Sequence, residues 1–379
     1  MWGIITAKYA VIRMYIHRRG EWPDFWWDDA SVLPVLAAVR HRQGRLIGRL
    51  ESLGFGLQQE ATLAAVSEEV IKTSEIEGEV LDQDEVRSSV ARHMGMDVAG
   101  LVASDRVVDG VVEMTLDAAR NFREPLTIER LFAWHAALFP TARSGMRQIS
   151  VGRWRTDESG PMQVVSGPIG REKIHFEAPT AALLEYEMAR FVAWFDDNEL
   201  DTVLQAAVAH FWFVTIHPFD DGNGRIARAI ADLALARGEK TSTRFYSMSA
   251  QIRAERKGYY DILERTQKGD LNITAWILWF LECLDGAFDC AESTLESVMA
   301  KAAFWNLHRD QALNARQLKV VNRLLDGFEG KLTTSKYKAL AKTSADTALR
   351  DINDLVARGI LVRGDASGRS TSYSILFPG

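Results

Sequence analysis

The chain has 379 residues, of which 47% are hydrophobic and 25% charged, and its formal net charge is −6. This composition is typical of a folded protein of two or three domains and excludes a disordered chain. The acidic balance argues against a protein that coats nucleic acid or an anionic membrane through bulk charge. The apolar runs are too short for a bilayer span, and the two cysteines, Cys283 and Cys290, are too few for a zinc site or a disulfide framework, so we expect a cytoplasmic protein without membrane contact.

The N-terminal third predicts helices. Apolar residues recur at helical spacing from Leu57 to Lys72, and Gly78 is a suitable stop for such a helix. Between them lies the segment Thr73-Ser74-Glu75-Ile76-Glu77, and a further carboxylate, Glu79, follows. Taken alone, this segment indicates an ordinary helix C-terminus.

A β-hairpin is predicted between residues 145 and 179. Two short β-prone runs, 162–166 and 173–177, flank the turn segment 167–171. We expect Trp154 and Arg155 to brace the base of this hairpin. The alternative is a surface hairpin without a binding role. Its strand residues are Met162, Gln163, Val164, Val165, Lys173, Ile174, His175 and Phe176.

The run His217-Pro218-Phe219-Asp220-Asp221-Gly222-Asn223-Gly224-Arg225-Ile226-Ala227-Arg228 lies between two apolar helical segments, 203–216 and 226–236. Gly222 and Gly224 let the backbone take a positive φ and approach a ligand closely, so that successive N–H groups can face an anion. The N-terminus of the following helix adds a partial positive charge. We therefore expect a phosphate at this loop.

The charged side chains of the same run fit a nucleotide. Asp221 repels phosphate unless a divalent cation such as Mg²⁺ lies between them. Arg225 and Arg228 share one face of the first helical turn, and their planar forks suit the outer phosphates of a triphosphate. A neutral His217 can take a proton from an incoming hydroxyl. Each feature alone is common, but together they indicate phosphoryl or nucleotidyl transfer.

The C-terminal part predicts a winged helix-turn-helix. Helices are expected at 316–326, 334–341 and 345–357, with strands at 360–363 and 369–376. Such a module contacts DNA or serves as a protein docking or dimerisation surface; acids at 346, 351 and 354 count against DNA. The local basic residues are Lys331, Lys336, Lys338, Lys342, Arg350, Arg358, Arg363 and Arg369.

The run 217–228 resembles the signature of the Fic family, His-Pro-Phe-x-(Asp/Glu)-Gly-Asn-Gly-Arg-x-x-Arg, at every fixed position. The resemblance implies transfer of AMP from ATP to a Ser, Thr or Tyr hydroxyl of a target protein, or of the chain itself, with release of pyrophosphate. By the same resemblance His217 is the general base and Asp221 the Mg²⁺ ligand. The anion hole around the α- and β-phosphates would consist of Gly222, Asn223 and Gly224, while Arg225 would hold the β-phosphate and Arg228 the γ-phosphate.

Two other segments are similar to features of this family. The pattern Thr73 to Gly78 resembles its inhibitory motif, (Ser/Thr)-x-x-x-Glu-(Gly/Asn), in which the glutamate, here Glu77, pairs with the second arginine, here Arg228. A carboxylate there would occupy the γ-phosphate position. The hairpin resembles the family's flap, which holds the target segment by strand addition.

The expected fold is mainly α: a Fic-type helical bundle with a β-hairpin flap, an N-terminal helical region and a C-terminal winged helix-turn-helix. The expected domains are 1–110, a helical region with the inhibitory motif; 111–290, the catalytic core; 291–312, a connecting helix; and 313–379, the winged helix. Tyr246, Tyr259 and Tyr260 are candidates for adenine contact, with core packing as the alternative.

Other functions remain open at the level of sequence. A Fic fold of different chemistry would transfer phosphate, UMP or phosphocholine, or would remove AMP. A third alternative is a DNA-binding regulator that only senses nucleotide, and the chain could also act as a homodimer.

Overall fold

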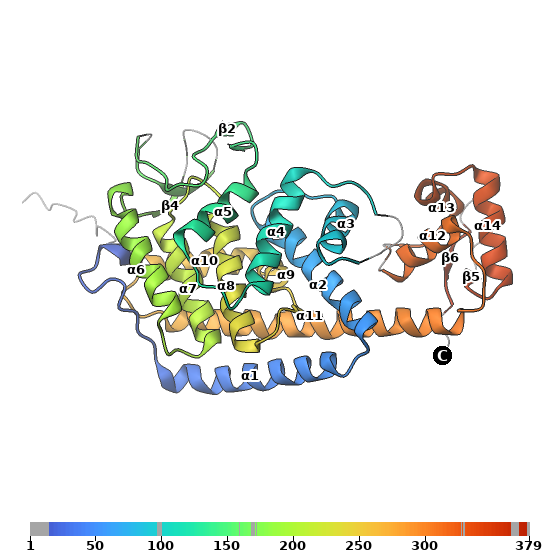
Figure 1. Cartoon of the computed structure of the whole chain (residues 1–379), viewed down its shortest axis with the longest axis horizontal. Helices are drawn as coiled ribbons and strands as arrows, with labels where there is room; N and C mark the ends of the chain where they lie inside the picture. The colour runs from blue at the N-terminus through green and yellow to red at the C-terminus, as the bar shows by residue number, and fades with distance from the viewer. Residues whose placement is uncertain are drawn as a thin grey trace, which may run out of the picture. The chain divides into compact units, whose positions relative to one another are not determined.

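The computed structural model describes residues 15–96, 101–158, 160–167, 171, 173–326, 328, 330–364 and 371–376. The protein is mainly helical, with short antiparallel hairpins (Figure 1). It divides into two compact units. The first comprises the described residues up to Leu53 and from Thr62 to Ala291; the second comprises Gly54–Ala61 and the described residues from Glu292 onward. None of the described helices is both long and apolar enough to cross a bilayer.

The first unit contains most of the helices. Two of them, α2 and α11, continue into the second unit. In chain order the elements are η1 (Ile16–Arg18), α1 (Asp29–Glu51), α2 (Phe55–Ile76), α3 (Gln83–His93), α4 (Arg106–Arg120), α5 (Ile128–Leu138), β1 (Arg143–Ser144), β2 (Arg147–Gln148), β3 (Gln163–Ser166), β4 (Lys173–Glu177), η2 (Ala181–Leu183), α6 (Leu184–Asp196), α7 (Thr202–Ile216), α8 (Asn223–Glu239), α9 (Met248–Ala254), α10 (Arg256–Gln267) and α11 (Thr274–Leu307).

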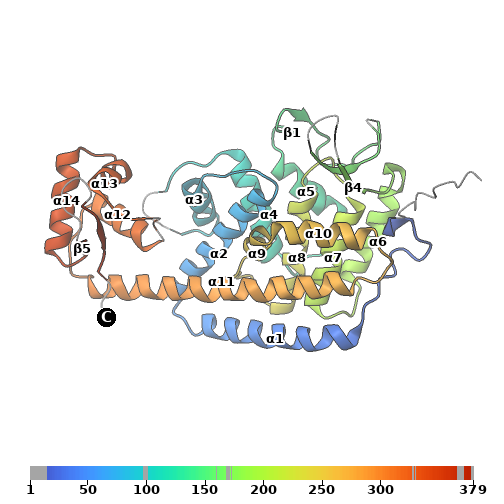
Figure 2. The same cartoon turned by 180° about the vertical axis from the view of Figure 1, so that it is seen from behind.

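Helix α7 forms the centre of this unit. Every residue from Val203 to Ile216 is buried, because the helix is apolar on all sides and is therefore surrounded by other elements. Helix α8 packs along one side of α7 and α6 along the other (Figure 1). In the view from behind, α10 lies in front of α7 and α8 (Figure 2). The loop between α7 and α8 carries the motif, so two buried helices fix both of its ends.

The N-terminal segment packs onto this bundle. The rings of Trp22 and Phe25 lie edge-on to Trp212 of α7, with centroids 6.3 and 5.9 Å away. The indole N–H of Trp22 donates to Glu187 at 2.9 Å. Along α1, Arg42 forms an ion pair of 2.6 Å with Asp285 of α11. The aromatic N-terminal segment therefore has a packing role.

The predicted hairpin is confirmed as the antiparallel pair β3 and β4. Val164 lies opposite Phe176, and a bulge separates Val164 from Val165, which lies opposite Ile174. Met162 extends the pairing because its carbonyl accepts the N–H of Ala178 at 3.0 Å. The predicted turn residues 168–170 lie outside the described residues.

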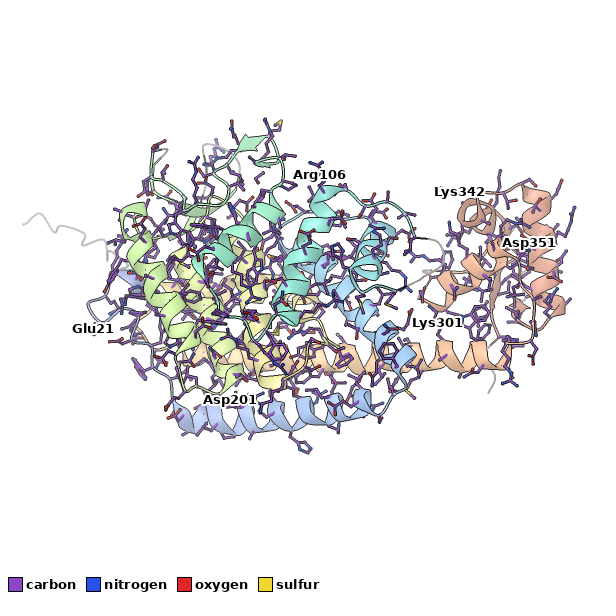
Figure 3. The ribbon with its side chains drawn as sticks, viewed as in Figure 1. Glu21, Arg106, Asp201, Lys301, Lys342 and Asp351 are labelled. Carbon is purple, nitrogen blue, oxygen red and sulfur yellow. The ribbon has the colours of Figure 1, made fainter. Side chains whose placement is uncertain are left out.

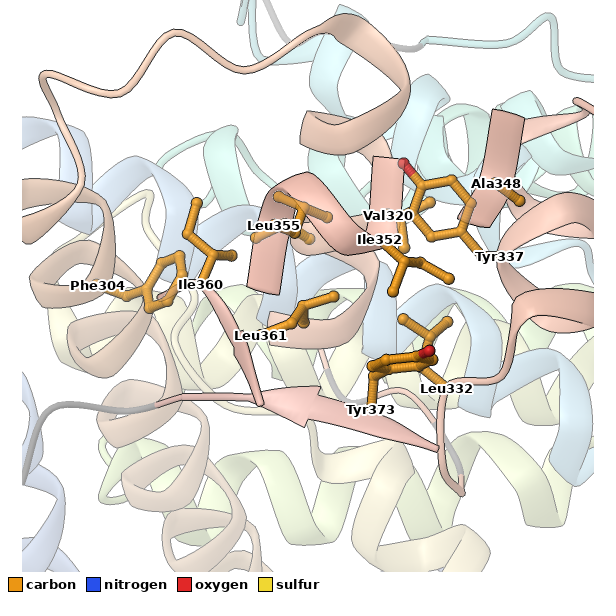
Figure 4. Packing of buried hydrophobic residues seen from close by; sticks show 11 residues of the cluster. Phe304, Val320, Leu332, Tyr337, Ala348, Ile352, Leu355, Ile360, Leu361 and Tyr373 are labelled. Atoms are coloured by element: carbon orange, nitrogen blue, oxygen red, sulfur yellow. The ribbon is translucent and has the colours of Figure 1, made fainter. Parts of the chain in front are cut away.

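The second unit contains the predicted C-terminal elements in the predicted order. They are α12 (Ala315–Leu325), α13 (Thr334–Ala341), α14 (Ala345–Ala357), β5 (Leu361–Arg363) and β6 (Tyr373–Ile375). Their buried side chains form one core, including Tyr337, Ile352, Leu355 and Tyr373 (Figure 4). Ser344 caps α14, as expected, by accepting the N–H of Thr347. The assignment as a winged helix stays a prediction.

The segment 291–312, where a connecting helix was expected, is helical up to Leu307 and forms the C-terminal part of α11. No glycine or proline interrupts the chain between Ala287 and Leu307, so the helix continues. Two other expected features, the stop at Gly327 and the start of the last strand near Arg369, lie outside the described residues.

Candidate functional site

The motif loop opens into a cavity of about 880 Å³. Its wall combines the motif, the hairpin, the end of α2 and helices α9 and α10. Residues far apart in the sequence therefore meet at one site. The lining includes Glu77, Met162, Gln163, Val164, Val165, His175, Phe176, His217, Asp221, Asn223, Gly224, Arg253, Arg256, Tyr259, Tyr260 and Glu264.

The backbone of His217 turns sharply out of α7. It adopts the left-handed conformation with φ of 53°, which is uncommon for a residue with a side chain, while its N–H still closes the helix on Phe213. The buried Arg155 stabilises this turn, because its Nε donates to the carbonyl of His217 at 2.8 Å. Arg155 Nη2 also donates to the carbonyl of Pro179 at 2.5 Å, so the same side chain braces the base of the hairpin, as expected.

The imidazole of His217 is held in one tautomer. Its Nδ1 lies 3.2 Å from the carbonyl oxygen of Val214. A carbonyl can only accept, so Nδ1 carries the proton and Nε2 keeps the lone pair. Burial lowers the pKa of His217 to about 4, with Arg155 acting in the same direction. The ring is therefore neutral near pH 7, with Nε2 as its basic atom.

The Asn223 side chain closes the loop before α8. Its amide donates to the carbonyl of Phe219 at 2.8 Å and its oxygen accepts the N–H of Phe219 at 2.9 Å. Because this side chain is engaged, a ligand at this point would meet backbone N–H groups, and the anion hole at Gly222, Asn223 and Gly224 stays a prediction. The first intrahelical bond runs from Ile226 to Gly222, which leaves the preceding N–H groups at the helix start without a helical partner.

The two motif glycines serve different purposes. Gly222 takes a φ of 81° as the N-cap of α8, as the sequence predicted. Gly224, by contrast, lies inside the helix, and the expectation of a positive φ was wrong for it. A Cβ at Gly224 would lie 2.2 Å from Glu77 Oε1, so a larger residue here would displace the Glu77 carboxylate. Both let a ligand atom approach the helix start closely.

Thr73 and Glu77, at the C-terminal end of α2, contact Arg228 of α8. The Arg228 side chain is 2% exposed and donates to the hydroxyl of Thr73 at 2.7 Å and to Glu77 Oε1 at 2.8 Å. Burial by itself lowers the pKa of Arg228, but Glu77, Tyr259 and Tyr260 together outweigh burial and the pKa is raised. Gly78 ends the helix with a φ of 88°, and its N–H donates to the carbonyl of Glu75 at 3.1 Å. Glu77 thus makes the contact with Arg228 that the resemblance to the inhibitory motif implied, and the bond from Arg228 to Thr73 adds to it.

Three neighbouring carboxylates have three different partners. Glu77 pairs with Arg228, while Glu79 pairs with Arg225 at 2.6 Å. Glu75 instead pairs with residues outside the motif, Lys72 at 3.1 Å and Arg253 at 3.4 Å. The ion pair between Glu79 and Arg225 was not predicted from the sequence.

The arginines retain unused donors. Among the described residues, the buried Arg225 Nε and Arg228 Nη1 have no acceptor. An anion with several oxygens could supply these acceptors at the start of α8. Asp221 lines the same cavity, with its carboxylate held by the N–H of Gly222 at 2.6 Å and by the hydroxyl of Ser144. One carboxylate beside phosphate oxygens matches the donor set of Mg²⁺, so these residues fit a metal-bound polyphosphate.

The hairpin is fastened to α10. His175 Nδ1 lies 2.5 Å from a carboxylate oxygen of Glu264, and its Nε2 lies 2.6 Å from the hydroxyl of Ser166 on the facing strand. Burial would raise the pKa of Glu264, but hydrogen bonds from Lys268 and His175 outweigh it and lower the pKa to about 2. Glu264 is therefore ionised and fixes β4 over the cavity.

The candidate adenine residues divide into two groups. Tyr246 is buried and does not line the cavity; its hydroxyl donates to Glu239. Tyr259 and Tyr260 line the cavity, although the Tyr259 hydroxyl also lies 2.9 Å from His210 Nε2. Burial raises the pKa of both cavity tyrosines, so both are neutral phenols. Core packing is therefore the role of Tyr246.

Comparison with known proteins matches these segments to described families. A family model described as Fic/DOC family matches residues 125–235, which include the whole motif, and a domain of unknown function (DUF4172) matches residues 15–96. Residues 125–235 thus match the Fic/DOC family. The pattern at 73–78 that resembles the inhibitory motif lies outside this match, in the segment that matches the domain of unknown function.

Named relatives are distant. Protein adenylyltransferase fic-1 of Caenorhabditis elegans is 27% identical over 250 residues, which are 64% of this chain and 46% of that protein. Protein adenylyltransferase Fic of Culex quinquefasciatus is 31% identical over 105 residues, 27% of this chain and 19% of that protein. The matched region thus spans less than half the length of either relative.

Solved structures agree on the fold. A Fic family protein from Desulfovibrio desulfuricans G20 aligns with a TM-score of 0.53 and 19% identity over 93% of this chain and 98% of that chain. A Fic domain containing signaling protein from Bacteroides thetaiotaomicron VPI-5482 aligns with a TM-score of 0.51 and 19% identity over 68% of this chain and 96% of that chain. The helical bundle of this chain therefore has the Fic fold.

Proposed function

We propose that this protein transfers AMP from ATP to a hydroxyl side chain of a target protein and that it inhibits itself through Glu77. The observation that carries this proposal is the convergence of His217 and the start of α8 on one cavity, whose wall also holds Glu77, the partner of the buried Arg228. Names of the relatives, which are protein adenylyltransferases, support the same chemistry.

The chain's own residues supply a base and an anion site. Neutral His217 Nε2 would take the proton of the target hydroxyl as its oxygen attacks the α-phosphorus. The bond from that phosphorus to the bridging oxygen breaks, and pyrophosphate leaves with the electron pair. Backbone N–H groups at the start of α8 would bind the phosphate oxygens where negative charge develops. A Mg²⁺ ion at Asp221 would neutralise the leaving charge when bound.

The binding roles of the arginines follow from their unused donors. Arg225 Nε and Arg228 Nη1 are buried without an acceptor in the described part of the chain, and we assign them to the β- and γ-phosphates respectively. Both guanidiniums are almost fully buried, so water does not compete with the ligand. This arrangement favours a triphosphate over a single phosphate.

Self-inhibition follows from the same contacts. Glu77 Oε1 occupies a donor of Arg228 and fills the space directly above Gly224. A γ-phosphate cannot take that place while the carboxylate is present, because the two are negatively charged and compete for the same donor. ATP then binds poorly, or in a pose unsuited to transfer of AMP.

We propose that the target protein binds at the hairpin of β3 and β4. Val165 and Ile174 are exposed apolar residues on β3 and β4, and the strands line the cavity beside His217. Strand addition uses main-chain hydrogen bonds and accepts many sequences. A Ser, Thr or Tyr on the added segment would then place its hydroxyl near His217 Nε2.

The test is covalent labelling with ATP that carries the label on the α-phosphate. Glu77→Gly should label itself or an added target strongly, and adding His217→Ala should abolish labelling while leaving ATP binding in place. Mass spectrometry should find an added AMP. An added phosphate or another nucleotide would establish a different chemistry on the same fold, and loss of AMP from a modified protein would establish the reverse reaction.

A further inference from the structure

The C-terminal unit has a charge opposite to that of the whole chain. From Lys331 to the end there are eight Lys and Arg and four Asp, whereas the full chain carries −6. The position of the acids decides whether this excess reaches solvent. Asp351 and Asp354 lie on α14 and would oppose an anionic partner if they were on its outer surface.

Asp351, whose position on α14 is labelled in Figure 3, is instead buried in its unit. It is 5% exposed and accepts from Arg316 at 2.9 and 3.2 Å, and from the hydroxyl of Tyr337 at 3.2 Å. Burial would raise the pKa of Asp351, but the hydrogen bonds, first that of Arg316, outweigh it and lower the pKa. The carboxylate is thus ionised but neutralised by Arg316 on the inner face.

Asp354 is engaged in the same manner. It accepts from Gln317 and from Arg358, both at 2.8 Å, and these bonds lower its pKa. Neither acid therefore contributes an unpaired charge to the outer face of α14. Asp346, in the first turn, is the exposed acid that remains on this helix within the described residues.

The outer face of α14 and the end of α13 carry unpaired cations. Arg350 is exposed on α14, next to exposed Asn353, and Lys338 and Lys342 are exposed at the end of α13. In the part of the chain that the structure describes, no carboxylate pairs with Arg350, Lys338 or Lys342. A cationic strip with no acidic partner attracts a polyanion.

We propose that the outer face of α14, together with the end of α13, binds duplex DNA. A 13-residue helix with outward side chains fits the B-form major groove, where arginine and asparagine can bond to base edges. Lys338 and Lys342 would contact the flanking phosphates. Duplex RNA does not fit, because its major groove is deep and narrow. Among the described residues of α13 and α14, Leu349 is the one exposed large apolar side chain, which is too little for the apolar core of a protein interface.

The experiment is fluorescence anisotropy of the full chain with a labelled duplex of about 20 base pairs, roughly two helical turns. Two phosphate contacts, from Lys338 and Lys342, give a salt slope of about −1.8, so binding should weaken about 12-fold between about 50 and 200 mM salt. The variant Lys338→Ala/Lys342→Ala/Arg350→Ala should weaken binding at least tenfold and flatten the slope by about two units. Asp346→Asn should tighten binding about twofold, because a like charge near the phosphates is removed.

A matched control removes the same charge elsewhere in the unit. Arg309→Ala/Lys319→Ala/Arg323→Ala replaces three exposed cations outside α13 and α14 and should leave affinity within about threefold. Equal loss in the two triple variants would mean bulk attraction and would overturn the proposal. The proposal would also be overturned if no DNA binding were measured at low salt, or if duplex RNA bound with equal affinity. A third contrary result is that DNA does not bind but the chain self-associates, and that the triple variant in α13 and α14 abolishes this self-association.

Discussion

Removal of the Glu77 side chain offers the sharpest test of self-inhibition. Arg228 is 2% exposed and Glu77 is 27% exposed, and the two share one charge-assisted hydrogen bond of 2.8 Å. Such a bond contributes roughly 1.5 to 3 kcal/mol. Because Glu77 is partly open to water, we expect the lower part of this range, which corresponds to about 10- to 40-fold at 1.4 kcal/mol per decade.

The expected result is that Glu77→Gly binds ATP about 10- to 40-fold more tightly in calorimetry and labels faster by a similar factor at subsaturating ATP. Glu77→Gln separates charge from space, because an amide keeps the volume above Gly224 but removes the charge. It should gain less than Glu77→Gly. A full gain in Glu77→Gln would mean that charge alone inhibits.

The control for these variants is Glu75→Gly. Glu75 lies at the same helix end but pairs with Lys72 and Arg253, so its loss should change ATP affinity less than about threefold. The reasoning is refuted if wild type and Glu77→Gly have the same ATP affinity and the same labelling rate, or if Glu75→Gly activates as strongly.

Three further predictions use other contacts of the site and its core. Glu79→Gln, made in the Glu77→Gly background, should raise ATP affinity by a further factor of about three to ten, since Arg225 loses its carboxylate partner; calorimetry measures it, and no change would make this pair irrelevant to binding. Glu264→Gln should loosen β4, which hydrogen exchange would detect as faster exchange, and should raise the KM for the target while the affinity for ATP stays constant. Burial lowers the pKa of His210 to about 3 in the folded protein, whereas the unfolded chain protonates this residue below the ordinary histidine pKa of 6.5. The Tm should therefore fall as the pH drops from 6.5 towards 3, and the fall in Tm should be smaller in His210→Gln.

Some of the site could be predicted because its determinants are contiguous. The motif from His217 to Arg228 lies in one loop and one helical turn, so residue type alone placed a base, a glycine N-cap and two arginines together. The hairpin strands and the three C-terminal helices were found for the same reason: apolar periodicity and capping residues act over a few positions. These features depend on local backbone geometry.

Other features could not be predicted because the partners are distant in sequence. The resemblance to the family's inhibitory motif named Glu77 as the partner of Arg228, but that Glu79 pairs with Arg225 and Glu75 with neither motif arginine depends on how the end of α2 packs against α8. The same holds for the bonds of Arg155 to the turn at His217 and to the base of the hairpin.

The sequence by itself therefore determined the chemistry of the loop and the order of the elements, and the tertiary structure decided which charges meet. Asp351 shows the difference: in sequence it is one more acid on a helix with a basic surface, yet in the folded unit it bonds to Arg316 and is buried. Helical periodicity sets which residues share a face, but only packing against other elements sets whether that face is covered. Whether a charged side chain needs an ion-pair partner depends on whether its face is covered, because burial removes its hydration and only a nearby opposite charge can replace the lost stabilisation.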